Sequence, residues 1–375
     1  GFRQEWESSA RLRGPFISSE FVTEVPSWYE DYDHGTFVRG SYFVLRDGLL
    51  RPTTLSRVGQ DGSVTDIRPF SSSVSDLSYD PVMDRIYWSE TITDPRWGHK
   101  ADSRVRYFDL EGRDLDDKKL FKPKTLSKKG RLYNPVASPD GKQIAVVDYR
   151  YMGGTDLVVL DAVSGKETGR FSAPSGLQLT LPSWFEGDIA AVGLSDAGMG
   201  IYSLDGGRFS EMVAPVKAKI GGLKSHGSSL VFTSDRTGVN ETYMYEGGKV
   251  RQLTATRYGA RNGIFEGDSL YFVSQETGIP LYRKNGKMRS KKHYGEGTLL
   301  HKASVDALLD REVDFQAVAG DRVADVLSRQ EQAIADGTMV IDDDALPQSV
   351  GSRRYNKLVH IPRFHSWAPV SVDFD

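Results

Sequence analysis

The stretch Asn134-Pro135-Val136-Ala137-Ser138-Pro139-Asp140-Gly141-Lys142-Gln143-Ile144-Ala145-Val146-Val147 decides the fold, because a tight turn leads directly into a short apolar strand. Pro139 and Gly141 suit such a turn, and Asp140 can cap it with its own side chain. We expect Gly141 to have a positive φ, where alanine would be strained. A turn in front of an apolar strand is typical of a β-hairpin.

This unit recurs along the chain. Six short apolar strands, the anchor strands, begin at Ser41, Arg85, Gln143, Asp188, Ser229 and Ser269. Successive starts are 44, 58, 45, 41 and 40 residues apart. A period of about 40–45 residues is that of a four-stranded propeller blade. We therefore predict an all-β fold, a six-bladed β-propeller of four-stranded antiparallel blades, in which each anchor strand is the second strand of its blade.

The longest interval contains an insertion near residues 113–131 that holds six lysines beside three aspartates. Such a loop could dock a phosphate or an acidic partner, but we interpret it as a solvated charged loop.

The ends of the chain depart from the repeat. We predict an N-terminal helical remnant or linker over 1–20, the propeller over 21–295, a helical extension and linker over 296–352, and a segment over 353–375 that leads to a further domain. Residues 21–25 alternate like a strand and could complete the last blade, whose own fourth strand, Lys287-Met288-Arg289, is weak. Apolar residues spaced by three and four from Val305 to Ile334 predict one or two helices, which Gly337 would end.

Composition excludes several classes of function. The chain has 48 Lys and Arg against 51 Asp and Glu, so it has no charge surplus for nucleic acid or an anionic membrane. It has no cysteine, which excludes disulfides and thiolate metal sites. It also lacks the Gly-x-Ser-x-Gly, His-Glu-x-x-His and phosphate-loop motifs. We predict no catalytic residue, no metal site and no cofactor.

Two motifs carry a family resemblance. Ser234-Asp235-Arg236-Thr237-Gly238, followed by Arg251-Gln252-Leu253-Thr254, resembles the repeat of TolB-type propellers, in which a strand ends in Ser-Asp-Arg-x-Gly and the blade closes with Arg-x-Leu-Thr. Ser138-Pro139-Asp140-Gly141-Lys142 is similar to the turn before the second strand in the same family. We interpret Asp235 and Arg236 as a salt bridge or loop brace, with a ligand contact as the alternative.

The C-terminal His365-Ser366-Trp367-Ala368-Pro369 resembles the segment that joins a TolB-like propeller to an outer-membrane barrel in large envelope proteins of Bacteroidota. This resemblance implies a periplasmic or outer-membrane-associated protein, which would reach the membrane only through flanking domains.

Propellers bind ligands where the inner strands converge at the channel mouth. The candidate contributors are Tyr133-Asn134, Leu181-Pro182-Ser183-Trp184, Lys224-Ser225-His226 and Arg261-Asn262, with Trp184 and Tyr133 as stacking surfaces. Glu90, Arg96 and Trp97 form a second constellation that could hold a peptide or a sugar, or pack as an ordinary loop.

We therefore predict a non-enzymatic binding module for a protein or peptide segment at the channel. Two alternatives remain at this point. One is a propeller enzyme acting on polysaccharide or peptide through Glu90, Asp94, Glu186 or Asp235, and the other is a structural spacer.

Overall fold

The computed structural model describes residues 9–24, 29–70, 73–94, 101–127, 130–275, 297–319 and 322–337, and the backbone of 281–284 and 287–290. For residues 322–326 it likewise describes the backbone alone. The chain divides into two compact units, of which residues 2–320 contain all the described strands.

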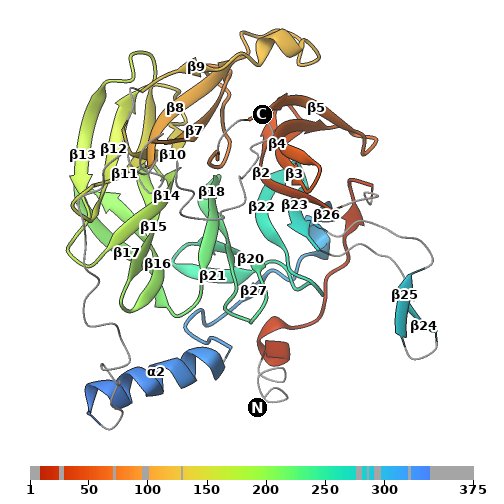
Figure 1. The fold of residues 1–375 in the computed structure, drawn as a ribbon, viewed down its shortest axis with the longest axis vertical. Coiled ribbons are helices and arrows are strands. Elements are labelled where there is room, and N and C mark those ends of the chain that lie inside the picture. The colour runs from red at the N-terminus through yellow and green to blue at the C-terminus, as the bar shows by residue number, and fades with distance from the viewer. Residues whose placement is uncertain are drawn as a thin grey trace, which may run out of the picture. The chain divides into compact units, whose positions relative to one another are not determined.

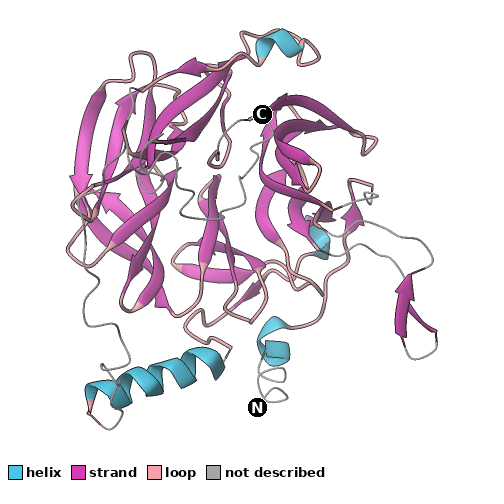
Figure 2. Ribbon diagram, viewed as in Figure 1, coloured by secondary structure: helices cyan, strands magenta, loops and turns pink. Residues whose placement is uncertain are grey.

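The strands of this unit form six antiparallel blades around a common centre (Figure 1), and helices are few (Figure 2). Blade one contains β2 (Glu30–Val38), β3 (Ser41–Gly48), β4 (Arg51–Val58) and β5 (Val64–Pro69). Blade two contains β6 (Ser78–Asp80), β7 (Arg85–Thr93), β8 (Ala101–Asp109) and β9 (Lys124–Thr125). Blade three contains β10 (Leu132–Ala137), β11 (Gln143–Tyr149), β12 (Thr155–Asp161) and β13 (Glu167–Ser172).

Blade four contains β14 (Gln178–Phe185), β15 (Asp188–Ser195), β16 (Gly198–Asp205) and β17 (Arg208–Val216). Blade five has five strands, β18 (Ile220–His226), β19 (Ser229–Ser234), β20 (Glu241–Glu246), β21 (Lys249–Gln252) and β27 (Arg311–Glu312). Blade six contains β22 (Arg261–Glu266), β23 (Ser269–Ser274), β26 (Leu299–Ser304) and β1 (Glu20–Phe21). The predicted six-bladed architecture is confirmed, and every anchor strand is the second strand of its blade.

The hydrophobic core is divided among the blade junctions, because each of the six buried clusters lies between two neighbouring blades. The strand β11 shows how this works. Ile144 and Val146 pack toward blade two, whereas Ala145 and Val147 pack toward blade four. An anchor strand is therefore buried on both faces, which explains why it reads as a continuous apolar run without alternation.

The insertion of blade two is fixed by two apolar side chains. Its 3-10 helix η1 (Lys118–Leu120) begins at Asp117, whose side chain accepts a hydrogen bond of 2.9 Å from the backbone N–H of Lys119. Leu120 and Phe121 are buried in the cluster between blades one and two. The described lysines of the insertion are exposed, and Lys118 donates to the backbone carbonyl of Asp66 over 2.7 Å.

Blade six closes differently from the prediction. The N-terminal residues do complete it, because β1 pairs with β26. Its third strand, however, is β26, so the predicted propeller boundary at residue 295 is wrong. The strand β25 (Lys287–Ser290), predicted as the weak fourth strand of this blade, pairs instead with β24 (Leu281–Lys284) in a separate hairpin.

At the start of the stretch from Val305 to Ile334, where the apolar spacing predicted one or two helices, the structure has only a single 3-10 turn, η2 (Val305–Ala307). The strand before it, β26, was not recognised because Leu299, Leu300 and His301 are all buried, which removes the alternation of a surface strand. The second predicted helix is confirmed as α2 (Arg322–Ala335), and Gly337 follows it at φ +68°. None of the helices in the described ranges is long and apolar enough to span a membrane.

Gly141 has the predicted positive φ, +68°, and a Cβ there would lie 2.8 Å from the Cβ of Val82. Gly112 has the same φ, with no atom within 4 Å of an added Cβ. We expect Gly112→Ala to cost about 1 kcal/mol of unfolding free energy through backbone strain alone. Gly141→Ala should cost at least ~1 kcal/mol more, because the methyl group also collides with blade two. Thermal denaturation of both variants measures the difference, and equal losses would contradict it.

Candidate functional site

The inner strands of five blades carry a bulge at the same place. The bulged residue is left-handed in each, with φ of 45–57° at His34, Asn134, Leu181, Gly222 and Asn262. In blade two, Asp76 occupies the corresponding position. It lies between two residues that pair with the anchor strand, Val74 with Glu90 and Ser78 with Tyr87. A bulge of this kind re-aims side chains at the rim of a barrel or next to a site.

These bulges surround the central cavity, a space of about 200 Å³ to which all six blades contribute. One lining residue from each blade is Thr36, Asp76, Asn134, Leu181, Lys224 and Ile264. The lining is mixed, with carboxylate, ammonium, amide and hydroxyl groups beside Leu181 and Ile264. Its volume lies below the roughly 300–1,000 Å³ of sites for drug-sized ligands, so it suits a single side chain or a short stretch of peptide backbone.

A charged cluster crosses the cavity wall. His34 of blade one donates from Nδ1 to the carboxylate of Asp76 in blade two, and its Nε2 lies 3.8 Å from Oδ2 of Asp33. Lys224 reaches from blade five to the backbone carbonyl of Gly35 in blade one. Asn262 of blade six donates to Asp33. The cluster therefore links four blades through one histidine–carboxylate contact and through hydrogen bonds from an ammonium group and an amide.

The surroundings of these groups change their pKa values. Burial works to lower the pKa of His34, but the hydrogen bond and charge of Asp76, with the charge of Asp33, raise it above its usual value. Burial works to raise the pKa of Asp76, yet the hydrogen bond from His34 holds it below the usual range. Burial lowers the pKa of Lys224 despite both carboxylates. The imidazolium form of His34 is thus favoured in the folded protein.

The structure brings only part of the predicted site together. Asn134 lines the central cavity, as predicted, and its amide donates to Thr180 Oγ1 over 3.3 Å. Tyr133, in the same strand, contacts Tyr149 edge to face, with ring centroids 5.4 Å apart. His226 lies exposed at the end of β18, stacked on Phe265.

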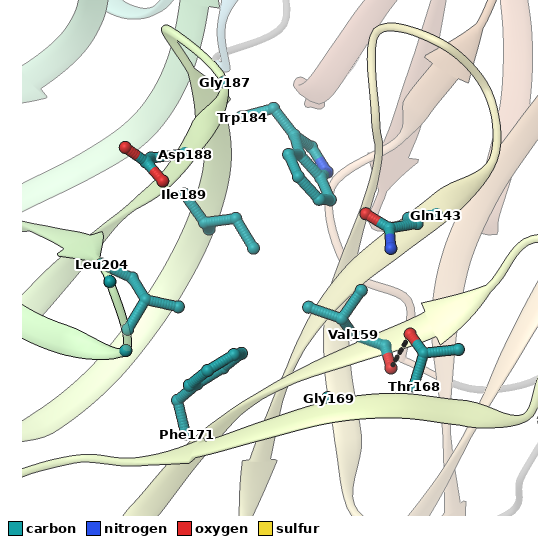
Figure 3. Close-up of a pocket in the computed structure, with 12 residues that line it drawn as sticks. Gln143, Val159, Thr168, Gly169, Phe171, Trp184, Gly187, Asp188, Ile189 and Leu204 are labelled. Carbon is teal, nitrogen blue, oxygen red and sulfur yellow. Dashed lines mark hydrogen bonds between the residues drawn. The ribbon is translucent and has the colours of Figure 1, made fainter.

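Trp184 lies in a different place from the channel mouth. Its indole N–H donates to the carbonyl of Val136 over 3.0 Å. Its ring forms one wall of a second cavity between blades three and four, the interblade crevice, shown in Figure 3. The prediction of Trp184 as a channel residue failed because side chains alternate along β14. Its neighbour Ser183 lines the central cavity instead.

The constellation in blade two is described only in part. Glu90, in β7, forms an ion pair with Arg106 of the neighbouring strand β8. Arg96 and Trp97 lie outside the described residues.

Asp235 and Arg236 brace the chain. The carboxylate of Asp235 accepts a hydrogen bond of 2.7 Å from the backbone N–H of Lys219. The guanidinium of Arg236, buried to 1% exposure, donates to the carbonyl of Asp314 over 2.6 Å and lies over the ring of Phe315. These contacts hold the segment after β27 against blade five. They are the contacts of a loop brace, as the sequence led us to expect.

Sequence reasoning missed His34 and Asp76. No local motif surrounds either residue. Their signal is positional, because the bulged residue lies seven residues before the anchor strand in blades one, four, five and six, and nine before it in blades two and three. Counting back from the anchor strands would have found both.

The family-model comparison and the sequence comparison with characterised proteins gave no match. Among solved structures, the chain is similar to TolB from Acinetobacter baumannii, with a TM-score of 0.44 and 14% identity over 66% of this chain and 62% of that one. It is similar to the β-propeller domain of the Trilobed protease from Pyrococcus furiosus, with a TM-score of 0.44 and 11% identity over 70% and 97%. It is also similar to the acylaminoacyl peptidase of Pyrococcus horikoshii, with a TM-score of 0.44 and 12% identity over 71% of this chain and 53% of that one.

These similarities concern architecture alone, and the chain spans about half of the peptidase. The class of the protein is settled by its own strand order: it is a six-bladed propeller. Its blades carry the TolB-like turn and strand-end motifs described above.

The His34–Asp76 contact predicts a pH dependence. A histidine whose folded-state pKa is raised contributes stability that is fully present below its unfolded pKa of about 6.5 and is lost as pH rises through the folded value. The substitution His34→Asn removes the imidazole charge, and asparagine still tolerates the positive φ at this position. The difference in melting temperature between wild type and this variant should therefore shrink from pH 6 to pH 9.

The pH dependence of the wild type alone would not isolate His34, because Glu241 also contributes to it. Burial raises the pKa of this carboxyl to about 7, so it also makes the wild type less stable as pH rises above about 4.5. Glu241 is present in both proteins and cancels in the difference. A difference that stays constant over the pH range would contradict the role of His34.

Proposed function

We propose that the domain binds an extended segment of a peptide or protein partner at the central cavity, without catalysing a reaction. The observation that carries this proposal is the lining of the cavity, where five of the six blades place polar side chains, donors and acceptors among them, around one small space. A peptide backbone offers N–H donors and C=O acceptors in alternation. A lining that holds both donors and acceptors can bond to the N–H groups and to the carbonyl groups of such a backbone. A lining with charges of a single sign could bond to only one of the two.

Lys224 is central to this proposal. Its ammonium group has three donors, and the carbonyl of Gly35 accepts one of them. The others can serve a carbonyl or carboxylate of the ligand. Asp76, across the cavity wall, supplies an acceptor for an incoming N–H.

We place this binding in the periplasm or at the outer membrane of a bacterium. That location rests on the resemblance of the Ser-Pro-Asp-Gly-Lys, Ser-Asp-Arg-x-Gly and His-Ser-Trp-x-Pro segments to envelope proteins. The flanking parts of the longer protein would make any contact with the membrane.

The enzyme alternative receives no support from the cavity. Glu90, Asp94, Glu186 and Asp235 are the carboxylates it requires, and none of them lines the central cavity. Glu90 is held by Arg106, and Asp235 caps the start of β18 through Lys219.

The test uses peptides selected from a random display library on the immobilised domain and then synthesised with a fluorescent label. We expect Lys224→Met to weaken their binding, measured by fluorescence anisotropy, at least about tenfold, because it removes a half-buried ammonium group from the centre of the site. Lys219→Met removes an exposed lysine of the same blade and should leave the affinity unchanged. Failure to enrich any peptide, or equal affinity for both variants, would favour the structural-spacer alternative.

A further inference from the structure

The interblade crevice is a second cavity of about 260 Å³. Val159 and Phe171 of blade three face Ile189 and Leu204 of blade four across it, and Trp184 forms the remaining wall (Figure 3). All five side chains belong to the hydrophobic cluster between these blades or pack against it. The crevice is therefore an opening into the core itself, and a guest there would meet these five apolar side chains, with the polar side chains of Gln143 and Thr168 beside them.

The walls of the crevice are fixed before any guest arrives. The indole N–H of Trp184 is already bonded to the carbonyl of Val136, so the ring has one orientation. The other walls are strand residues of two packed blades. At the rim, Gly187 and Gly206 have no atom within 4 Å of an added Cβ, so the entrance is open. A guest would not need to order the site, which lowers the entropic cost of binding.

The rim of the crevice is acidic. Asp188 lines it, and Glu186 and Asp205 lie in the two hairpin turns that border it, Glu186-Gly187-Asp188 and Asp205-Gly206-Gly207-Arg208. Within these two turns, three carboxylates lie near one guanidinium group, that of Arg208. All three are exposed, and none forms an ion pair with another described residue. An apolar hole with an acidic rim complements an apolar group between positive charges.

We propose that the interblade crevice binds a partner peptide through one large aliphatic or aromatic side chain flanked by Lys or Arg. The apolar side chain enters between Trp184 and Phe171, and the flanking cations lie over the two acidic turns. The cavity volume allows one such side chain, so the site would recognise a short sequence motif centred on that residue. It is separate from the central cavity and rests on different residues, so it stands whether or not Lys224 binds a ligand.

The test uses three labelled synthetic peptides in fluorescence anisotropy. The first has a leucine flanked on each side by two lysines, the second has glutamates in place of the lysines, and the third has glycine in place of the leucine. We expect the first to bind at least about tenfold more tightly than either of the others. Its affinity should fall with added salt, because the rim charges are exposed.

The charge variant Glu186→Gln/Asp188→Asn/Asp205→Asn should weaken the first peptide about tenfold, since each exposed charge contributes only modestly. Blade six offers a matched control, because Glu266-Gly267-Asp268 is the same turn sequence. Glu266→Gln/Asp268→Asn should therefore leave the affinity unchanged. Lys224→Met should also leave it unchanged, which separates this site from the central cavity.

Equal binding of the lysine and glutamate peptides, or equal losses in the charge variant and the blade-six control, would overturn the proposal. Self-association in sedimentation velocity that disappears in the charge variant would overturn it as well, because it would assign the crevice to a second copy of the chain.

Discussion

The fold depends on closing a ring between blade six and blade one. Each anchor strand is buried on both faces, so a blade without two neighbours exposes apolar surface. Five junctions join blades that are adjacent along the chain. The sixth junction, between blade six and blade one, must bring together residues that are far apart in the sequence. It does so by pairing β1 with β26, and by the buried hydroxyl of Thr298, which accepts a hydrogen bond of 2.8 Å from the N–H of Tyr32.

The same closure positions the central cavity. The strand β2 carries Tyr32 into the cluster between blades six and one, and Asp33 and His34 follow it directly. Asp31 of this strand pairs with Arg261 of blade six over 3.0 Å. His34 reaches forward to Asp76 of blade two. One strand thus joins its two neighbouring blades by charged contacts at the cavity, so ring closure and the electrostatics of the site are coupled.

The repeat was predictable because a blade imposes strong local demands. A turn with a residue at positive φ precedes each anchor strand, and in five of the six blades that residue is a glycine, as at Gly141, so the pattern is visible without any knowledge of neighbours. Blade six was harder because its four strands come from three separate parts of the chain. Nothing local in Leu299–Ser304 distinguishes a strand buried on both faces from part of a helix. Pairing with Glu20–Phe21 is a long-range property.

The candidate site was harder to predict for a similar reason. Asn134 was found because an amide at the start of an inner strand is a plausible ligand contact in itself. Trp184 was placed in the wrong cavity, since only the register of the bulge at Leu181 decides which face of β14 it occupies. His34 and Asp76 matter through their mutual contact across two blades. That contact depends on ring geometry and leaves no trace in either local sequence.

Leu181 shows how packing and the site constrain each other. The other left-handed bulge residues are His, Asn or Gly, which tolerate positive φ, whereas leucine in this conformation costs roughly 1–2 kcal/mol. Its side chain is partly buried against the cluster between blades four and five, and full burial of a leucine would contribute about 1.5–3 kcal/mol. Packing therefore offsets part of the backbone strain at Leu181. The apolar part of the cavity wall is set by the core, while its polar part is set by the junctions at which His34, Asp76 and Lys224 meet.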